Sequence, residues 1–277
     1  MIRLQTDVLI MSCDTITDYP LIPFINDFRI HDATLTSLLA QAPAFSSIVG
    51  KAKDKSEKDL IGLSDEEKSR IVFLNSEADF SENVSIKRSM MNQCPNFIIH
   101  RNLLDAHVYI IKRWVIDYVV KHDLSSIKGE LLPLLVQEQF TRGGSELKDF
   151  YKLSDREKVS EMFEPTKGPL KGLFLKRDSS CERIVCRSHM INHGFCLRAN
   201  NVTSYLEANK LVAANPLLWN VTPSKMRGVY SSVVGKEHSI GDKSTVRRCV
   251  IGKKSVIGCK AKLQDSLLMQ ESTVGDG

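Results

Sequence analysis

The feature that most constrains the fold is a repeat in the last part of the sequence, between Val234 and Gly277. An aliphatic residue recurs about every six positions, glycine usually follows it, and a small residue such as Ser244, Ser255 or Ala261 often lies four positions on. The aliphatic residues are Val234, Ile240, Val246, Ile251, Ile257, Leu263 and Val274. This period is typical of a triangular parallel β-helix, with the aliphatic side chains inward and glycine at the corners. An antiparallel segment with glycine turns is the alternative, but the fixed spacing favours the β-helix despite register shifts near Val250 and Leu268.

The N-terminal part of the sequence indicates a strand, a helix and a second strand, which together make a βαβ unit. Asp7–Ser12 is an apolar run of strand-forming residues, Leu21–Ile30 has helical spacing, and Thr34–Leu39 is the second strand candidate. In such units the chemistry lies at the carboxyl ends of the strands. Asp14, which follows the first strand, is therefore a candidate site residue, and the alternative is an aspartate in an ordinary strand-end turn.

Four further stretches have recognisable patterns. Ala44–Glu67 is polar and lysine-rich and is expected to be a loop. Leu104–Lys121 is expected to be one long helix that is apolar on more than one side. Residues 183–198 are expected to form a β-hairpin. Ser204–Ala214 is expected to be a helix with Ser204 as N-cap and Glu207 at the third helical position.

Composition argues against several functional classes. The 277 residues carry a formal net charge of +5, but no dense block of Lys and Arg has interleaved aromatic residues, so nucleic-acid binding is not indicated. The longest apolar helix candidate, Ala106–Val120, contains Lys112, Arg113 and Asp117 and is too short to span a membrane. The densest group of possible metal ligands is Cys181, Cys186, His189, His193 and Cys196. It lacks the paired spacing of a zinc site, and the seven cysteines fit a reduced compartment such as the cytosol.

Five stretches resemble the gamma subunit of eukaryotic translation initiation factor 2B. They are Leu9–Asp18 (LIMSCDTITD), Leu103–Asp117 (LLDAHVYIIKRWVID), Ser125–Phe140 (SSIKGELLPLLVQEQF), Ser204–Lys210 (SYLEANK) and Ser244–Gly252 (STVRRCVIG). The resemblance spans nearly the whole chain. It implies an α/β protein: an incomplete doubly wound nucleotidyltransferase-like sheet, followed by a left-handed parallel β-helix of hexapeptide repeats.

The domains expected from this layout are a nucleotidyltransferase-like domain at 1–215, a linker at 216–230 and the β-helix at 231–277. Set beside that family, the chain lacks the N-terminal phosphate-loop region and the last coils of the β-helix. With both ends open, the chain is expected to self-associate or to be buried against a partner.

The resemblance also implies a role in the exchange factor that reloads initiation factor 2 with GTP. The implied partners are the epsilon subunit, the other subunits of the complex and initiation factor 2, with no cofactor, no direct nucleic acid and no membrane. The chain has no sign of the catalytic helical-repeat domain of epsilon, which favours gamma. The implied location is the cytosol.

Sugar-nucleotide pyrophosphorylases share this layout and hold Mg²⁺ with a strand-end aspartate and a later aspartate. Asp14 matches the first aspartate. When Ser204 and Tyr205 are aligned with the Tyr-containing helix start of that family, Arg198 takes the place of the second aspartate, where a cation repels Mg²⁺. These residues are therefore expected to be a vestigial metal and nucleotide site, with no catalytic or metal-binding residues. The alternatives are a pyrophosphorylase of the mannose-1-phosphate guanylyltransferase type and a regulatory subunit that senses a small molecule.

Overall fold

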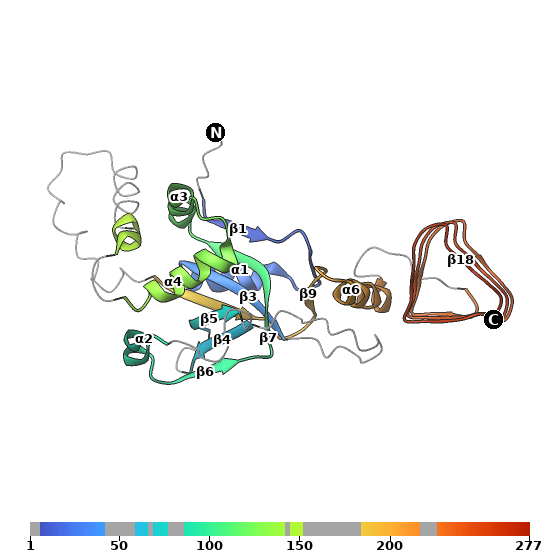
Figure 1. The fold of residues 1–277 in the computed structure, drawn as a ribbon, viewed down its shortest axis with the longest axis horizontal. Coiled ribbons are helices and arrows are strands. Elements are labelled where there is room, and N and C mark those ends of the chain that lie inside the picture. The colour runs from blue at the N-terminus through green and yellow to red at the C-terminus, as the bar shows by residue number, and fades with distance from the viewer. Residues whose placement is uncertain are drawn as a thin grey trace. The chain divides into compact units, whose positions relative to one another are not determined.

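The computed structural model of the chain describes residues 6–41, 59–65, 69–76, 86–141, 145–151, 184–216 and 226–277. Contacts divide the chain into two compact units. Unit 1 comprises Met1–Cys13, Tyr19–Pro43 and Lys55–Phe195, and unit 2 comprises Asp14–Asp18, Ala44–Asp54 and Cys196–Gly277. Figure 1 shows α/β elements in the first and a solenoid in the second.

The main sheet of unit 1 has the strand order β1-β7-β3-β8. Its strands are β1 (Val8–Met11), β7 (Leu103–Ile111), β3 (Leu35–Gln41) and β8 (Cys186–Met190). Strand β7 is antiparallel to β1 and β3, whereas β3 and β8 are parallel. The expected strand, helix and strand are present, with α1 (Leu21–Ile30) as the helix, and the α/β class is confirmed. The sheet is mixed, because β7 runs between the two parallel strands of the βαβ unit.

The expected single helix over Leu104–Lys121 is wrong for its first half. Residues up to Ile111 belong to β7, and α3 (Arg113–His122) begins only after Lys112. Strand β7 pairs on both sides, and its four residues from Val108 to Ile111 are all buried. The sequence of a strand enclosed in this way is a continuous apolar run. Such a run also satisfies the spacing of apolar residues in a helix, so periodicity alone does not separate the two.

A second sheet of unit 1 has the antiparallel order β5-β4-β6. Its strands are β4 (Asp59–Ser64), β5 (Ile71–Ser76) and β6 (Phe97–His100), and α2 (Arg88–Gln93) precedes β6. The loop expected over Ala44–Glu67 is therefore wrong at β4, where Asp-Leu-Ile-Gly-Leu-Ser is almost wholly buried. Residues 44–58 and 66–67 lie outside the described residues.

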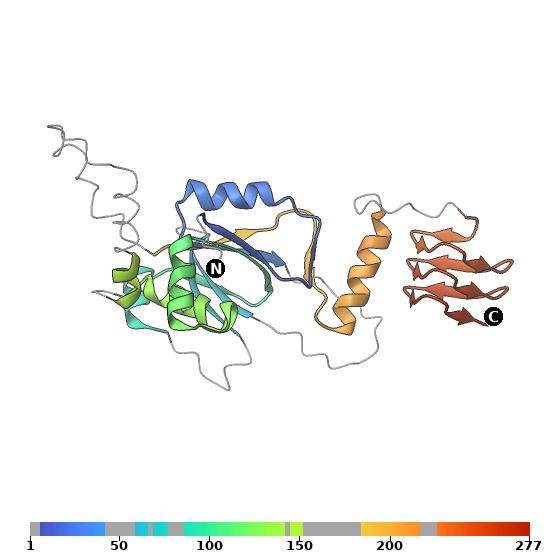
Figure 2. The ribbon, with the colours of Figure 1, turned by 90° about the horizontal axis from the view of Figure 1, so that it is seen from above.

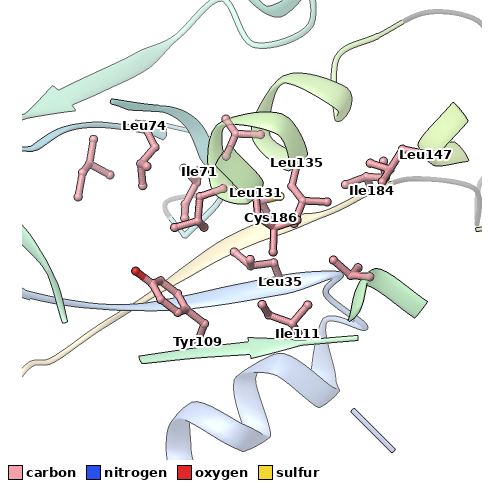
Figure 3. Packing of buried hydrophobic residues seen from close by; sticks show 14 of the residues in the cluster. Leu35, Ile71, Leu74, Tyr109, Ile111, Leu131, Leu135, Leu147, Ile184 and Cys186 are labelled. Atoms are coloured by element: carbon pink, nitrogen blue, oxygen red, sulfur yellow. The ribbon is translucent and has the colours of Figure 1, made fainter. Parts of the chain in front are cut away.

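The core of unit 1 lies between the main sheet and its helices. Segment η2 (Ile127–Leu131, a π-helix) leads into α4 (Leu132–Glu138), and the Ser126 hydroxyl caps η2 by accepting from the Gly129 N–H at 2.9 Å. Figure 3 shows Leu131 and Leu135 of these segments facing Leu35 and Ile111 of the sheet. Burial of this apolar surface is the main term that holds the unit together.

The β-hairpin expected over residues 183–198 is wrong. Strand β8 pairs in parallel with β3, and β9 (Cys196–Arg198) pairs antiparallel with β2 (Thr15–Thr17) in unit 2. Both segments are strands, as their residues indicate, but the partner of each strand is distant in sequence.

The β-helix is confirmed as three parallel sheets of three short strands each. The first sheet contains β10 (Val229–Tyr230), β13 (Thr245–Arg247) and β16 (Lys262–Gln264); the second contains β11 (Val233–Val234), β14 (Val250–Ile251) and β17 (Leu267–Leu268); the third contains β12 (Ser239–Ile240), β15 (Val256–Ile257) and β18 (Thr273–Val274). Figure 1 looks along the coils and Figure 2 shows them stacked. Every paired residue lies 17 positions from its partner in the next coil. One side is thus a residue shorter than a hexapeptide, which accounts for the shifts near Val250 and Leu268.

The core of the β-helix contains every aliphatic residue of the repeat. Val246, Ile251 and Ile257 are buried, and Val234, Ile240, Leu263 and Val274 pack against them as partly buried side chains. Val229, Cys249 and Leu268 also lie in this cluster, although the predicted repeat did not include them. The small residues fit the corners: the buried Ser255 hydroxyl, for example, donates to the Met269 carbonyl at 3.0 Å.

Helix α6 (Val202–Ala214) lies against β14 of the solenoid. The first coil strand, β10, begins at Val229, inside the stretch 216–230 expected to be a linker, of which 217–225 lie outside the described residues. None of the helices described is long and apolar enough to cross a lipid bilayer.

Candidate functional site

The two site residues expected from the sequence meet on a short ribbon of unit 2. Strands β2 and β9 pair antiparallel, with Thr15 opposite Arg198. The Ala199 N–H donates to the Asp14 carbonyl at 2.9 Å and extends the pairing by one residue. Asp14 and Arg198 are therefore held at the same end of the ribbon, although 184 positions separate them in sequence.

The Asp14 carboxylate and the Arg198 guanidinium form an ion pair. Arg198 Nη2 lies 2.9 Å and Nε lies 3.1 Å from Asp14 Oδ2, and Nε lies 3.4 Å from Oδ1. Both side chains are about three-quarters buried, with exposed fractions of 23% and 24%. Partly buried pairs of this geometry are stronger than exposed ones, because less water competes for the charges.

The residues present at this end of the ribbon do not make a donor set for a divalent cation. Mg²⁺ takes oxygen ligands, usually one or two carboxylates together with water and phosphate oxygens. Here the Asp14 carboxylate is neutralised by Arg198, and a metal ion would have to displace the guanidinium and then lie beside it. Across the residues described, no group of three or more His, Cys, Asp or Glu side chains is arranged to hold a metal.

The helix that follows the ribbon begins earlier than the sequence indicated. Asn201 is the N-cap of α6, and its Oδ1 accepts from the Ser204 N–H at 2.7 Å. Ser204 is therefore not the N-cap, and Glu207 forms an ion pair with Lys210 at 3.3 Å within the helix. Asparagine caps as well as serine does, so the capping-box pattern was ambiguous by one turn.

A second polar cluster, inside unit 1, was missed by the sequence analysis. Asp105 on β7 accepts from the Tyr109 hydroxyl at 2.5 Å, from the His107 N–H at 2.9 Å and from the Ser37 hydroxyl at 3.3 Å. The register of β3 and β7 shifts at this point, and His107 has a positive φ of 53°. The His107 carbonyl then accepts from the Ser12 N–H at 3.0 Å. Asp105 thus holds a β-bulge beside the end of β1.

Burial raises the pKa of the Asp105 carboxyl above its ordinary value. The hydrogen bonds from Tyr109 and from the His107 N–H act in the opposite direction, as does the positive charge of Lys128. Tyr109 and Ser37 are themselves almost fully buried, so the cluster offers no nucleophile to solvent. Its chemistry is that of a satisfied internal network which fixes the bulge.

Replacing Asp105 with asparagine should reveal this titration in the pH dependence of stability. A folded-state pKa above the unfolded value of about 3.9 means that the contribution of Asp105 is fully present below that value and is lost as pH rises through the folded-state pKa. The unfolding free energy of the wild type minus that of Asp105→Asn should therefore fall as pH rises above about 4. Urea denaturation of both proteins across this range measures the difference, and a constant or rising difference would contradict the assignment.

One signal in the sequence could have found this cluster. Leu-Leu-Asp-Ala-His-Val-Tyr-Ile-Ile is an apolar run except for Asp105 and His107. A carboxylate in a buried strand needs hydrogen-bond donors, and Tyr109 lies on the same face because four residues separate them.

Three curated proteins are similar to the chain. The translation initiation factor eIF2B subunit gamma of Schizosaccharomyces pombe is 27% identical over 248 residues, which cover 88% of this chain and 50% of that protein. The subunit gamma of Dictyostelium discoideum is 23% identical over 225 residues, covering 72% of this chain and 50% of the relative. The subunit gamma of Caenorhabditis elegans is 32% identical over 143 residues, covering 50% of this chain and 34% of the relative. The chain resembles eIF2B subunit gamma.

This similarity confirms the resemblance stated from the sequence. The chain spans about half the length of the first two eIF2B gamma relatives that it matches. No protein-family model matches it.

The gamma-like stretches contain the parts of both units described above. Leu9–Asp18 carries Asp14, Leu103–Asp117 forms β7 with Asp105, and Ser125–Phe140 forms η2 and α4. The remaining two lie in α6 and in the middle coil of the solenoid. The eIF2B gamma resemblance is therefore not confined to the repeat, which many unrelated proteins could share.

Proposed function

We propose that this chain is a non-catalytic scaffold subunit of the initiation factor 2B guanine-nucleotide exchange complex. In this proposal it has a nucleotidyltransferase-like domain and a left-handed β-helix, pairs with the epsilon subunit in the cytosol, and promotes GDP/GTP exchange on initiation factor 2. The observation that carries the proposal is the similarity to three eIF2B gamma subunits, the first of which covers 88% of this chain.

The ion pair between Asp14 and Arg198 supports the absence of nucleotidyl transfer. Attack on a polyanionic phosphate requires a metal or an equivalent cluster of cations to neutralise charge. At the ribbon end the Asp14 carboxylate, which would be the ligand for Mg²⁺, is paired with the Arg198 guanidinium instead. The pyrophosphorylase alternative is therefore not favoured, and no observation favours a sensor of small molecules.

A GDP-release assay on initiation factor 2 tests the proposal. The chain alone should leave the rate of GDP release unchanged, because a scaffold cannot distinguish the loaded from the empty form of the GTPase by itself. Added to the epsilon subunit, it should form a complex that survives size-exclusion chromatography and releases GDP faster than epsilon alone.

Two further arms separate the alternatives. Asp14→Asn should leave the stimulation of epsilon intact, and the wild type should release no pyrophosphate from GTP or UTP with a sugar 1-phosphate and Mg²⁺. Pyrophosphate release that Asp14→Asn abolishes would establish the pyrophosphorylase instead. Failure to bind epsilon, or GDP release by the chain alone, would refute the scaffold.

A further inference from the structure

The middle of the solenoid contains an unbroken run of basic residues. Between Lys243 and Gln264 the sequence has no Asp or Glu, and its cations are Lys243, Arg247, Arg248, Lys253, Lys254, Lys260 and Lys262. Winding into coils of 17 residues distributes these cations over the corners and sides of the β-helix. The distribution is uneven, and it decides which side can dock a charged partner.

The three sides of the solenoid differ in what they expose. The β11-β14-β17 side has α6 against β14, and its outward residues Val233, Val250 and Leu267 are partly buried. The β12-β15-β18 side exposes Ser239, Val256 and Thr273, which carry no charge. The β10-β13-β16 side exposes Tyr230, Arg247, Lys262 and Gln264. We call this last side, with its flanking corner residues Lys243, Arg248 and Lys260, the basic face.

Lysines are stacked on one edge of the basic face at a cost to stability. Lys243 and Lys260 are 17 residues apart and therefore lie at the same corner of adjacent coils, which are separated by about 4.8 Å. Both are exposed and have positive φ values of 61° and 58°. The left-handed backbone belongs to the fold, because corner residues of other types, such as Glu237 and Glu271, also have a positive φ. The repulsion between the stacked lysines is what the fold does not require, and Asp242 is the acidic residue next to them in sequence.

The arginines of the basic face are held in place. The Arg247 guanidinium lies over the Tyr230 ring, 5.3 Å from its centroid, and Tyr230 is 55% exposed. Arg248 forms an ion pair with Asp265 at 2.7 Å, and the Asp265 side chain is only 7% exposed. Asp265 is therefore already paired with Arg248, and it does not neutralise the other cations of the basic face. Tyrosine and arginine are the residue types most enriched where protein partners bind tightly.

We propose that the basic face of the β-helix is a docking surface for an acidic segment of a partner protein. Arginine and lysine side chains in this arrangement match carboxylates, to which the planar guanidinium binds through two hydrogen bonds. A nucleic acid is the less suitable partner. Tyr230 is the one Phe, Tyr or Trp between Met226 and Gly277, and Arg247 lies over its ring, so the solenoid lacks the series of aromatic side chains on which successive bases of a single strand stack. This docking surface does not depend on the exchange function proposed above.

A labelled poly-glutamate peptide is the probe for the basic face. Binding to the full chain is followed by fluorescence anisotropy, and the affinity should fall with added salt. Arg247→Glu/Lys262→Glu should weaken it at least about tenfold. The matched control is Lys236→Glu/Lys253→Glu, which makes the same change in net charge at an exposed corner between the other two sides. It should change the affinity by less than about twofold. Arg247→Gln/Lys262→Gln should also weaken binding, and circular dichroism checks that each variant folds.

Three outcomes would overturn the proposal. Absence of peptide binding to the wild type at low salt would show that the basic face does not bind acidic segments. An equal loss in the control variant would show that net charge alone attracts the peptide. A single-stranded poly-uridine that binds more tightly than the peptide, and loses affinity in Tyr230→Ala, would identify a nucleic-acid surface instead.

Discussion

Replacing Gly258 with alanine should destabilise the solenoid by about 3 kcal/mol, whereas the same replacement of Gly275, one coil later in the same column, should change stability by less than about 0.5 kcal/mol. A Cβ on Gly258 would lie 2.6 Å from the Asp276 backbone nitrogen and 2.6 Å from the Gly275 carbonyl carbon. Backbone atoms cannot turn aside as the end of a side chain can. A Cβ on Gly275 would meet nothing within 4 Å.

Hydrogen exchange of the amides from Val256 to Gly258 measures this difference locally. The Gly258 N–H donates to the Val274 carbonyl at 2.9 Å, so opening of the coil exposes it to exchange. Protection should drop in Gly258→Ala and persist in Gly275→Ala. Equal protection in the two variants would mean that the coils are not packed as closely as described.

Replacing Lys128 with methionine should cost about 3–5 kcal/mol of folding stability. Lys128 Nζ lies 3.0 Å from Oδ2 of Asp59, a residue only 3% exposed. The other carboxylate oxygen, Oδ1, has no hydrogen-bond partner among the described residues. Without the lysine the carboxylate would be buried beside Asp105 with no compensating charge.

Lys121→Met is the matched control for this variant. Lys121 pairs with Glu146 at 3.5 Å, but these side chains are 56% and 64% exposed, so its loss should cost less than about 1 kcal/mol. Urea denaturation gives both values, and adding Asp59→Asn to Lys128→Met should recover part of the larger loss. Similar costs for the two lysine variants would show that Asp59 is better solvated than its burial indicates.

The sequence predicted those elements whose pattern is complete within a short window. The solenoid is the clearest example, because each coil repeats the same contacts and all seven aliphatic residues of the predicted repeat lie in its core. The first strand, α1 and β3 were also predicted, because each has its own period. Strand β7 failed because burial on both faces removed the alternation that marks a strand.

Pairing between distant segments could not be predicted in the same way. Strands β8 and β9 look like a hairpin in sequence, yet their partners are β3 and β2. That Asp14 and Arg198 belong to one site was predicted from the family resemblance, not from any local pattern in the sequence. The cluster around Asp105 was missed because its donors come from β3 and from a bulge whose geometry no short window encodes.

The coil length of 17 residues fixes the register between successive turns of the solenoid. An insertion or deletion of one residue in a strand would change the spacing of 17 residues for the one turn of chain that follows it, and would put the aliphatic side chains of that turn out of phase with the coil before. Removing one whole coil, such as residues 243–259, would leave Lys260 to follow Asp242 and the remaining strands in register. The length of this part of the protein can therefore drift in evolution only by complete turns, or by extra residues confined to its exposed corners.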